Sequence, residues 1–216
     1  MATMEQLRDR LVTRQVEARG VRDPLVLAAM RAVQREAFVP KELRREAYDD
    51  TPLPIGSGQT ISQPYIVAFM IEALGLRGGE KVLEIGTGSG YAAAILSEIA
   101  SDVFTIERIG QLAESAARNL ASAGCDNVHV RHADGTEGWS EESPFDAILV
   151  SAGAPDVPKT LIRQLKVGAR MVVPVGSDPR SQELIRITRR GDDEFEREDI
   201  ADVRFVPLIG KEGWES

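Results

Sequence analysis

Three glycines follow a short apolar segment near the middle of the 216-residue chain. The run from Val82 to Tyr91 reads VLEIGTGSGY, so Gly86, Gly88 and Gly90 alternate with small polar residues. A buried strand that enters a glycine-rich turn and then a helix lets the backbone approach a ligand closely. The run therefore predicts a nucleotide-binding turn.

Two carboxylates accompany this turn. Glu84 lies two residues before Gly86, and Glu107 ends the next apolar segment. An acid placed like Glu107 accepts hydrogen bonds from ribose hydroxyls. Glu84 would repel a pyrophosphate but attract an ammonium or sulfonium group, and the spacing G-x-G-x-G differs from the G-x-G-x-x-G of dinucleotide sites. These features favour S-adenosylmethionine over NAD, and a tight turn without a ligand is the third interpretation.

Asp134 and Gly135 follow the third apolar segment of this region. An aspartate there could accept a hydrogen bond from an adenine amino group, while the glycine admits close approach. Asp-Gly is also a common turn. The pair is informative because open α/β sheets bind ligands at the carboxyl ends of their strands.

The elements that must position these residues alternate between strand and helix. Strands are predicted over 81–86, 102–107, 127–132, 145–151, 169–176, 183–191 and 199–210, and helices over 91–100, 109–124 and 158–168. Apolar strands alternating with helices predict a mainly parallel sheet covered on both faces. The last two strands lack a helix between them, so the charged segment 191–199 is expected to be the turn of an antiparallel hairpin.

The first part of the chain reads differently. Residues 1–50 predict an N-terminal helical addition, with helices over 4–19 and 25–33, an Asp23-Pro24 start for the second, and a third charged segment after Pro40. Residues 51–75 combine a Pro- and Gly-rich loop with an apolar helix that begins at Pro64 and ends near Gly75. Residues 80–216 hold the cofactor-binding core, and all three parts are expected to form one domain.

Composition and missing motifs argue against several classes of function. Lys and Arg number 26 against 34 Asp and Glu, a net charge of −8, which argues against tight binding to duplex nucleic acid. No apolar stretch is long enough to span a membrane, and the single Cys125 fits a reducing cytosol. The only histidines, His129 and His132, are predicted to be structural or exposed, so no metal site is expected. P-loop, nucleophile-elbow and amino-methylating [DNS]-P-P-[YFW] motifs are absent.

Longer motifs extend the pattern over nearly the whole chain. AYDDTPLPIGSGQTISQPYIVAFM is the most specific of them, followed in order by VLEIGTGSGYAAAIL, TIER, HADG, PFDAILVSAGAP, LKVGARMVVPVG and VRFVPLIGKEGW. In these segments the chain resembles the protein-L-isoaspartate O-methyltransferases, of the class I S-adenosylmethionine-dependent fold. The resemblance implies a doubly wound, Rossmann-like, seven-stranded α/β sheet.

The resemblance also assigns roles to residues. Ser62 matches the active-site serine of the family; Gln59, Thr60, Ile61 and Ser62 match cofactor-contacting positions. Glu84, Gly86, Gly88 and Gly90 match the turn at the methionine end, Glu107 the ribose-binding acid, and Asp134-Gly135 the adenine loop. Gln182 matches a further cofactor position, although the loop before it, Ser177 to Ser181, departs from the usual glycine pair.

The implied reaction is methyl transfer to the α-carboxylate of L-isoaspartyl residues in damaged proteins. An α-carboxylate is ionised at neutral pH, which fits a chain with few histidines because no base is required. Ser62 is expected to orient the acceptor; its alternative role is to cap the helix at Pro64. The rival functions are a class I methyltransferase acting on RNA or a small molecule, a non-catalytic S-adenosylmethionine-binding module, and an NAD oxidoreductase. We expect a cytoplasmic monomer that binds neither nucleic acid nor membrane.

Overall fold

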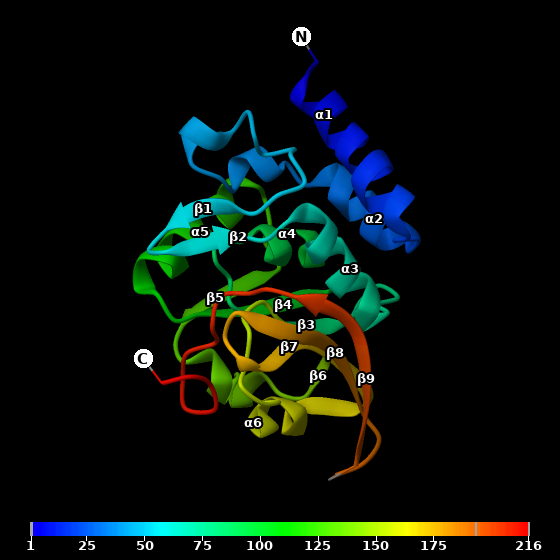
Figure 1. Cartoon of the computed structure of the whole chain (residues 1–216), viewed down its shortest axis with the longest axis vertical. Helices are drawn as coiled ribbons and strands as arrows, with labels where there is room; N and C mark the ends of the chain where they lie inside the picture. Colours follow the sequence, from blue (N-terminus) through cyan, green and yellow to red (C-terminus); the bar gives the residue numbers. More distant parts are fainter. Residues whose placement is uncertain (1, 193, 216) are drawn as a thin grey trace.

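A seven-stranded sheet forms the centre of the molecule (Figure 1). The computed structural model describes residues 2–192 and 194–215. The strand order is β5-β4-β3-β6-β7-β8-β9, in which β3 to β7 run parallel and β8 and β9 are antiparallel to their neighbours. The strands are β3 (Lys81–Ile85), β4 (Asp102–Glu107), β5 (Val128–His132), β6 (Phe145–Val150), β7 (Leu165–Asp178), β8 (Ser181–Arg189) and β9 (Phe195–Val203). The predicted mainly parallel sheet with a C-terminal antiparallel hairpin is confirmed.

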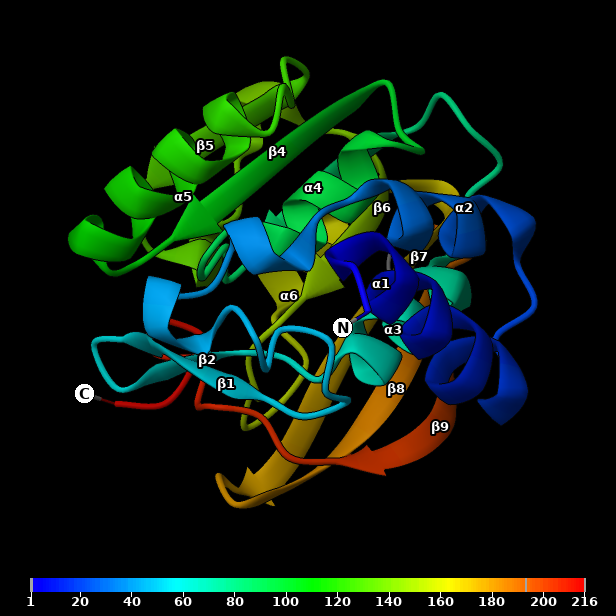
Figure 2. The ribbon, with the colours of Figure 1, turned by 90° about the horizontal axis from the view of Figure 1, so that it is seen from above.

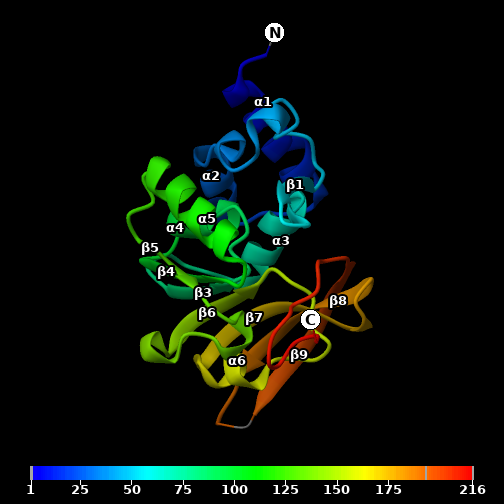
Figure 3. The ribbon, with the colours of Figure 1, turned by 90° about the vertical axis from the view of Figure 1, so that its left-hand side faces the viewer.

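Helices cover the two faces of this sheet unequally (Figure 3). On one face lie α2 (Pro24–Ala32), α3 (Pro64–Leu74), α4 (Tyr91–Ser97) and α5 (Gly110–Ser122); on the other lies α6 (Lys159–Arg163). Successive strand residues alternate between two apolar clusters, as Val82 and Leu83 do. The sheet is thus doubly wound as predicted. On the face that α6 covers, much of the packing comes from short 3₁₀ turns (Gly135–Glu137 and Ser140–Glu142) and from the C-terminal segment.

The N-terminal part is helical, but less regularly than predicted. The expected helix over 4–19 is α1 (Met4–Leu11) followed by a π-helical turn (Val12–Val16) and a 3₁₀ turn (Glu17–Arg19), which ends at Gly20 with a φ of 108°. The start of α2 is as predicted, since the Asp23 carboxylate accepts hydrogen bonds from the first-turn amides. After Pro40 the chain forms only a 3₁₀ turn (Lys41–Leu43) and bends, so a regular third helix is absent there. Across residues 2–192 and 194–215, no helix combines the length and apolarity that crossing a bilayer requires.

The loop after residue 51 contains a hairpin that was not predicted. Strands β1 (Leu53–Gly56) and β2 (Gln59–Ile61) pair antiparallel. The turn between them uses positive φ angles at Gly56, Ser57 and Gly58. A proline such as Pro54 is tolerated because the hairpin has only two strands, both with a free edge. Figure 2 shows the hairpin on the same side of the molecule as the C-terminus.

Two elements in the C-terminal half have other boundaries than predicted. The helix expected over 158–168 ends at Arg163, and β7 already begins at Leu165, which pairs with Phe145 across a register shift. The strand expected over 199–210 begins at Phe195 and ends at Val203, so the turn is shorter than 191–199; residue 193 lies outside the described residues. The charged start of β9 forms a strand because it lies at the edge of the sheet and faces water, where charged residues are favoured.

Candidate active site

The glycine-rich turn lies where the order of the sheet reverses. It connects β3 to α4, and β3 is flanked by β4 on one side and β6 on the other. Gly86 has a φ of 91°, and a β-carbon there would lie 3.5 Å from Cβ of Ser151, which follows β6. In open α/β sheets the crevice at this position receives ligands. The turn therefore opens onto a site formed by several strand ends.

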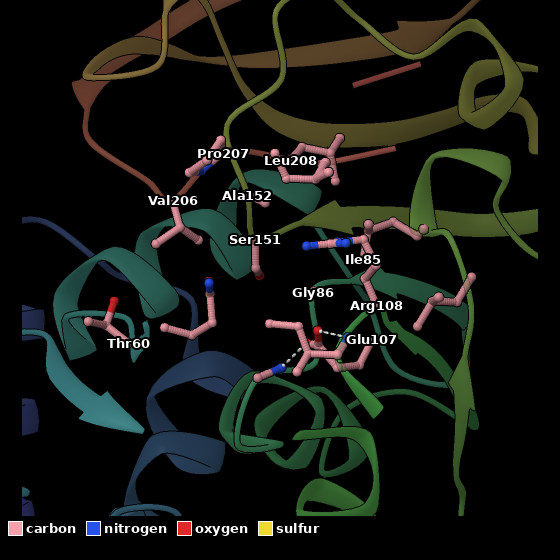
Figure 4. Close-up of a pocket in the computed structure, with 16 residues that line it drawn as sticks. Thr60, Ile85, Gly86, Glu107, Arg108, Ser151, Ala152, Val206, Pro207 and Leu208 are labelled. Atoms are coloured by element: carbon pink, nitrogen blue, oxygen red, sulfur yellow. Dashed lines mark hydrogen bonds between the residues drawn. The ribbon is translucent and has the colours of Figure 1, made fainter. Parts of the chain in front are cut away.

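The first of three cavities at this edge of the sheet lies beside Glu107 (Figure 4). Its walls come from the hairpin, the strand ends and the C-terminal segment: Gln59, Thr60, Ile85, Gly86, Gly88, Ile106, Glu107, Arg108, Ile109, Gly135, Ser151, Ala152, Val206, Pro207, Leu208 and Ile209. Gly135 is required by close packing, because a β-carbon there would lie 2.4 Å from Cγ2 of Ile85. Apolar walls that carry a few polar groups, among them the Glu107 carboxylate, suit a nucleoside.

Glu107 is buried but fully partnered. One carboxylate oxygen accepts a hydrogen bond from Gly88 N at 2.9 Å, and the other accepts one from Ile109 N at 2.9 Å. These two bonds connect the glycine turn to the start of α5. Each carboxylate oxygen has a second lone pair, so Glu107 can still accept hydrogen bonds from a ligand in the first cavity.

The second cavity lies beneath the glycine turn and contains Glu84. It is lined by Thr60, Ile61, Ser62, Val67, Met70, Glu84, Gly86, Thr87, Gly88, Ser89, Tyr91, Ala92, Leu149 and Ser151. The Thr105 hydroxyl donates to Oε2 of Glu84 at 2.6 Å, whereas Oε1 of Glu84 and the hydroxyl of Ser89 have no hydrogen-bond partner among the described residues. A buried polar atom without a partner costs free energy, so this cavity is built for a polar ligand.

The electrostatics of Glu84 point to a cationic ligand. Burial raises the pKa of its carboxyl group to about 8, and the nearby charge of Glu107 adds to this rise, while the Thr105 hydrogen bond opposes it. A cation bound against Oε1 would reverse the effect of burial and favour the ionised carboxylate. The second cavity thus has the chemistry to hold an ammonium group.

Ser62 lies on the wall between the second cavity and a third. The third cavity is lined by Pro52, Thr60, Ser62, Gln63, Ile66, Ser151, Asp202, Val203, Arg204, Phe205 and Val206. Ser62 therefore lies between the chamber that contains Glu84 and a chamber bordered by the hairpin and the chain after β9.

Asp50 holds the segment that carries Ser62, and the sequence analysis missed it. Its Oδ1 accepts a hydrogen bond from Tyr65 N at 3.0 Å, and its Oδ2 accepts one from Nε2 of Gln63 at 2.8 Å. Oδ2 also pairs with Nη1 of Arg19 at 2.8 Å. The N-cap residue of α3, Gln63, makes no side-chain capping bond of its own. Asp50 thus caps α3 from outside, and Ser62 does not have the capping role considered as its alternative.

Most of the site residues predicted from the sequence come together here. Gln59, Thr60, Ile61, Ser62, Glu84, Gly86, Gly88, Glu107 and Gly135 line the first or second cavity. Gly90 lines neither; it is the N-cap of α4, with a φ of 96°. The sequence missed Arg108, Ser89 and the Val206–Ile209 part of the wall, the last because this segment was predicted to be strand.

Asp134 and Gln182 lie outside both cavities. The Asp134 carboxylate accepts hydrogen bonds from Lys211 N and Thr136 N, each at 2.9 Å, and so faces the C-terminal segment. Gln182 is buried, donates to the carbonyl of Pro179 at 2.7 Å, and accepts from Phe205 N at 2.8 Å. In this structure both residues hold the wall of the site and do not form its surface.

The described ranges, 2–192 and 194–215, contain no cluster of three or more His, Cys, Asp or Glu side chains arranged to hold a metal ion. His129 stacks on Phe104, and His132 contacts the carbonyl of Arg108. Both histidines are exposed, in agreement with the prediction.

The fold and the cavities at the switch point define a Rossmann-like protein of the class I methyltransferase type. The chain matches the model of the protein-L-isoaspartate(D-aspartate) O-methyltransferase family over residues 6–213, and it belongs to that family.

Individual relatives agree with the family match. The chain is 63% identical over 209 residues to protein-L-isoaspartate O-methyltransferase 1 of Rhodopseudomonas palustris strain HaA2, covering 97% of this chain and 85% of the relative. It is 58% identical over 205 residues to the enzyme of strain CGA009 of that species, covering 95% and 94%. Among solved structures, a protein-L-isoaspartate O-methyltransferase superposes with a TM-score of 0.85 at 31% identity, covering 95% of this chain and 66% of the other. A Plasmodium falciparum protein of this kind, in complex with S-adenosyl-L-homocysteine, superposes with a TM-score of 0.82 at 26% identity, covering 94% and 98%.

Proposed function

We propose that this chain transfers the methyl group of S-adenosylmethionine to the α-carboxylate of L-isoaspartyl residues in damaged proteins and peptides. The ester then closes to a succinimide without the enzyme, and hydrolysis returns part of it to aspartate. The observation that carries the proposal is the position of Ser62, between the cavity of the unpartnered Glu84 carboxylate and the third cavity. Membership of the family supports the same substrate.

The residues present fit the cofactor. Glu84 would hold its ammonium group, because Oε1 is buried and lacks a partner. Glu107 would accept hydrogen bonds from the ribose hydroxyls, and Gly86 and Gly88 line both cavities, so one ligand can extend across them. When bound, the cofactor supplies a sulfonium-linked methyl group as the electrophile.

The acceptor needs orientation more than activation. An α-carboxylate has a pKa of about 3.3 to 3.7, so it arrives ionised and no proton has to be removed. A carboxylate oxygen would be the nucleophile toward the methyl group that the bound cofactor supplies, and the sulfur of the cofactor would leave with the electron pair of the carbon–sulfur bond. Ser62 would donate a hydrogen bond that fixes the carboxylate in line with the methyl group, at a distance of about 3 to 3.5 Å.

The third cavity is the proposed place for the peptide. Its walls include Pro52 from the start of the hairpin and Arg204 from the chain after β9. We expect the peptide to bind in an extended form through main-chain hydrogen bonds, so that the enzyme recognises the kinked isoaspartyl linkage and not the flanking side chains.

Methyl transfer to matched peptides tests the proposal. Radiolabelled S-adenosylmethionine is incubated with an isoaspartyl peptide and with its normal aspartyl isomer, over several flanking sequences. We expect labelling of the isoaspartyl forms only, and loss of most activity in Ser62→Ala with unchanged cofactor binding. Equal labelling of both isomers, or labelling of neither, would refute the assigned substrate; full activity of Ser62→Ala would refute its assigned role.

We further propose that the protein acts as a cytoplasmic monomer without a metal ion or a nucleic-acid partner. The support is the net charge of −8 and the single cysteine. Light scattering coupled to size-exclusion chromatography should give a mass near 23.6 kDa. Chelation by EDTA should leave methyl transfer unchanged.

A further inference from the structure

The three cavities meet at one place, and two side chains line all of them. These are Thr60, on strand β2, and Ser151, directly after strand β6. Ser62 lines the second and third cavities but not the first. Because the first two cavities fit the cofactor and the third fits the peptide, the methyl group must pass from one to the other at this junction.

Ser151 is held firmly by its backbone. Its amide donates a hydrogen bond to the carbonyl of Ile85 at 2.8 Å, which extends the pairing of β6 with β3 by one residue. It also lies beside Gly86, where a β-carbon would be 3.5 Å from Cβ of Ser151. Figure 4 shows the side chain pointing from the end of β6 into the cavity. Its hydroxyl makes no hydrogen bond to another side chain or carbonyl within the described part of the chain.

We infer that Ser151 is a second catalytic hydroxyl, which donates a hydrogen bond to the acceptor carboxylate alongside Ser62; this inference rests on the proposed function. A carboxylate has two oxygens and about four acceptor positions, so it can accept from both serines while one lone pair attacks the methyl carbon. Ser62 approaches from the segment between β2 and α3, and Ser151 from the end of β6. Two donors from different elements determine the plane of the carboxylate, which one donor leaves free to rotate.

The charge change in the reaction explains why hydroxyls suit this junction. A cationic sulfonium and an anionic carboxylate become a neutral thioether and a neutral ester, and no proton is transferred. A lysine or arginine on the carboxylate would therefore stabilise the reactants more than the transition state. Neutral donors orient the acceptor with a smaller penalty. Thr60 and Ser151, which both carry hydroxyls, are the residues that line all three cavities.

Ser151 is the better candidate of these two. Thr60 belongs to the two-stranded hairpin and is exposed to solvent, so its hydroxyl competes with water. Ser151 is half-buried at the end of a central strand. Donors fixed before the reaction, in a site that excludes water, contribute most to catalysis.

The test compares Ser151→Ala with Ser151→Thr, which keeps the hydroxyl, and with Thr60→Val. Ser122→Ala is the matched control, because that exposed serine on α5 only bonds the carbonyl of Arg118. For each protein, kcat/KM with an isoaspartyl peptide, Kd for S-adenosylhomocysteine and Tm are measured. We expect kcat/KM of Ser151→Ala to fall about tenfold to a hundredfold, the effect of one hydrogen bond to a charged group. Its Kd and Tm should match those of Ser122→Ala, and Ser151→Thr should recover most of the rate.

Three results would overturn the role of Ser151: an unchanged rate in Ser151→Ala, a loss explained by weaker cofactor binding, or a loss found in Thr60→Val instead. If Ser151→Ala does not fold, Ser151→Gly removes the same hydroxyl and is judged by the same criteria. A wild-type enzyme that labels no isoaspartyl peptide would refute the proposed function itself. A wild-type enzyme that labels the peptide, with Ser151→Ala at an equal rate, would refute only the present inference.

Discussion

Glu84 and Glu107 are the same residue type on neighbouring strands of one sheet, yet their surroundings differ. Their side chains are 1% and 7% exposed. Both oxygens of Glu107 accept hydrogen bonds from backbone amides of the glycine turn and the α5 start, whereas one oxygen of Glu84 has no partner in the described structure. The backbone of the protein thus supplies a partner for each oxygen of Glu107 but not for Oε1 of Glu84. This difference is the basis of our proposal that a cationic group of the cofactor binds Glu84.

The largest expected effect comes from replacing Glu84 by glutamine. The amide cannot form an ion pair with the cofactor ammonium, so Kd for S-adenosylmethionine should rise about a hundredfold. Calorimetric titration measures this. Methylthioadenosine, which lacks the amino-acid part, is the control ligand and should bind both proteins equally well. An equal loss for the two ligands would mean that Glu84 supports the whole cavity and not the ammonium group.

The second effect is a pH dependence of stability without cofactor. The folded pKa of Glu84, about 8, lies above its ordinary value of 4.5. The folded protein therefore holds the proton more tightly than the unfolded chain does. The stability that protonated Glu84 contributes is fully present below pH 4.5 and is lost as the pH rises through 8. Between these values the free energy of unfolding falls by about 1.4 kcal/mol per pH unit. Urea unfolding between pH 6 and 8 should show a steeper decline for the wild type than for Glu84→Gln; parallel curves would contradict the raised pKa.

The third effect separates the two acids. In Glu107→Gln only one side-chain oxygen remains, so either Gly88 N or Ile109 N loses its acceptor. A buried amide without a partner costs about 2 kcal/mol of unfolding free energy. Urea unfolding at pH 8 should show this loss for Glu107→Gln and none for Glu84→Gln. The comparison of the two acids would fail if both variants lost equal stability.

Asp50 extends the comparison to a third, fully partnered carboxylate, with a smaller expected effect. Asp50→Asn weakens the bonds to Gln63 and Tyr65 and the ion pair with Arg19, which should cost about 1 kcal/mol of unfolding free energy. Because the Ser62 segment is loosened, kcat should fall while cofactor Kd stays constant. The neighbouring Asp49 is exposed, and Asp49→Asn is the control. Equal behaviour of the two variants would show that Asp50 does not position the segment.

The same contrast explains what the sequence could predict. Glu84, Glu107 and the glycines are set by a local strand–turn–helix pattern, so their shared location followed from apolar periodicity. Asp50 bonds Gln63, 13 residues further along the chain, and Gln182 bonds Phe205, 23 residues further along. No local sequence pattern specifies such partners. The hairpin was missed because Pro54 and the glycines around Ser57 conceal strands of only a few residues. In the sequence, nothing distinguishes Ser151 from any other serine that follows a strand. Only the structure shows that it lines three cavities.

Proton release on cofactor binding tests the role of Glu84 most directly. At pH 6.5 an α-amino group of pKa about 7.7 to 8.0 is already charged, so it contributes few protons. Glu84, with its pKa raised to about 8, is mostly protonated before binding and should ionise against the ammonium group. Calorimetry in two buffers of different ionisation enthalpy should therefore show release of nearly one proton by the wild type and none by Glu84→Gln. No release by the wild type, or the same release by both proteins, would contradict the assignment of Glu84 as the acid that the ligand completes.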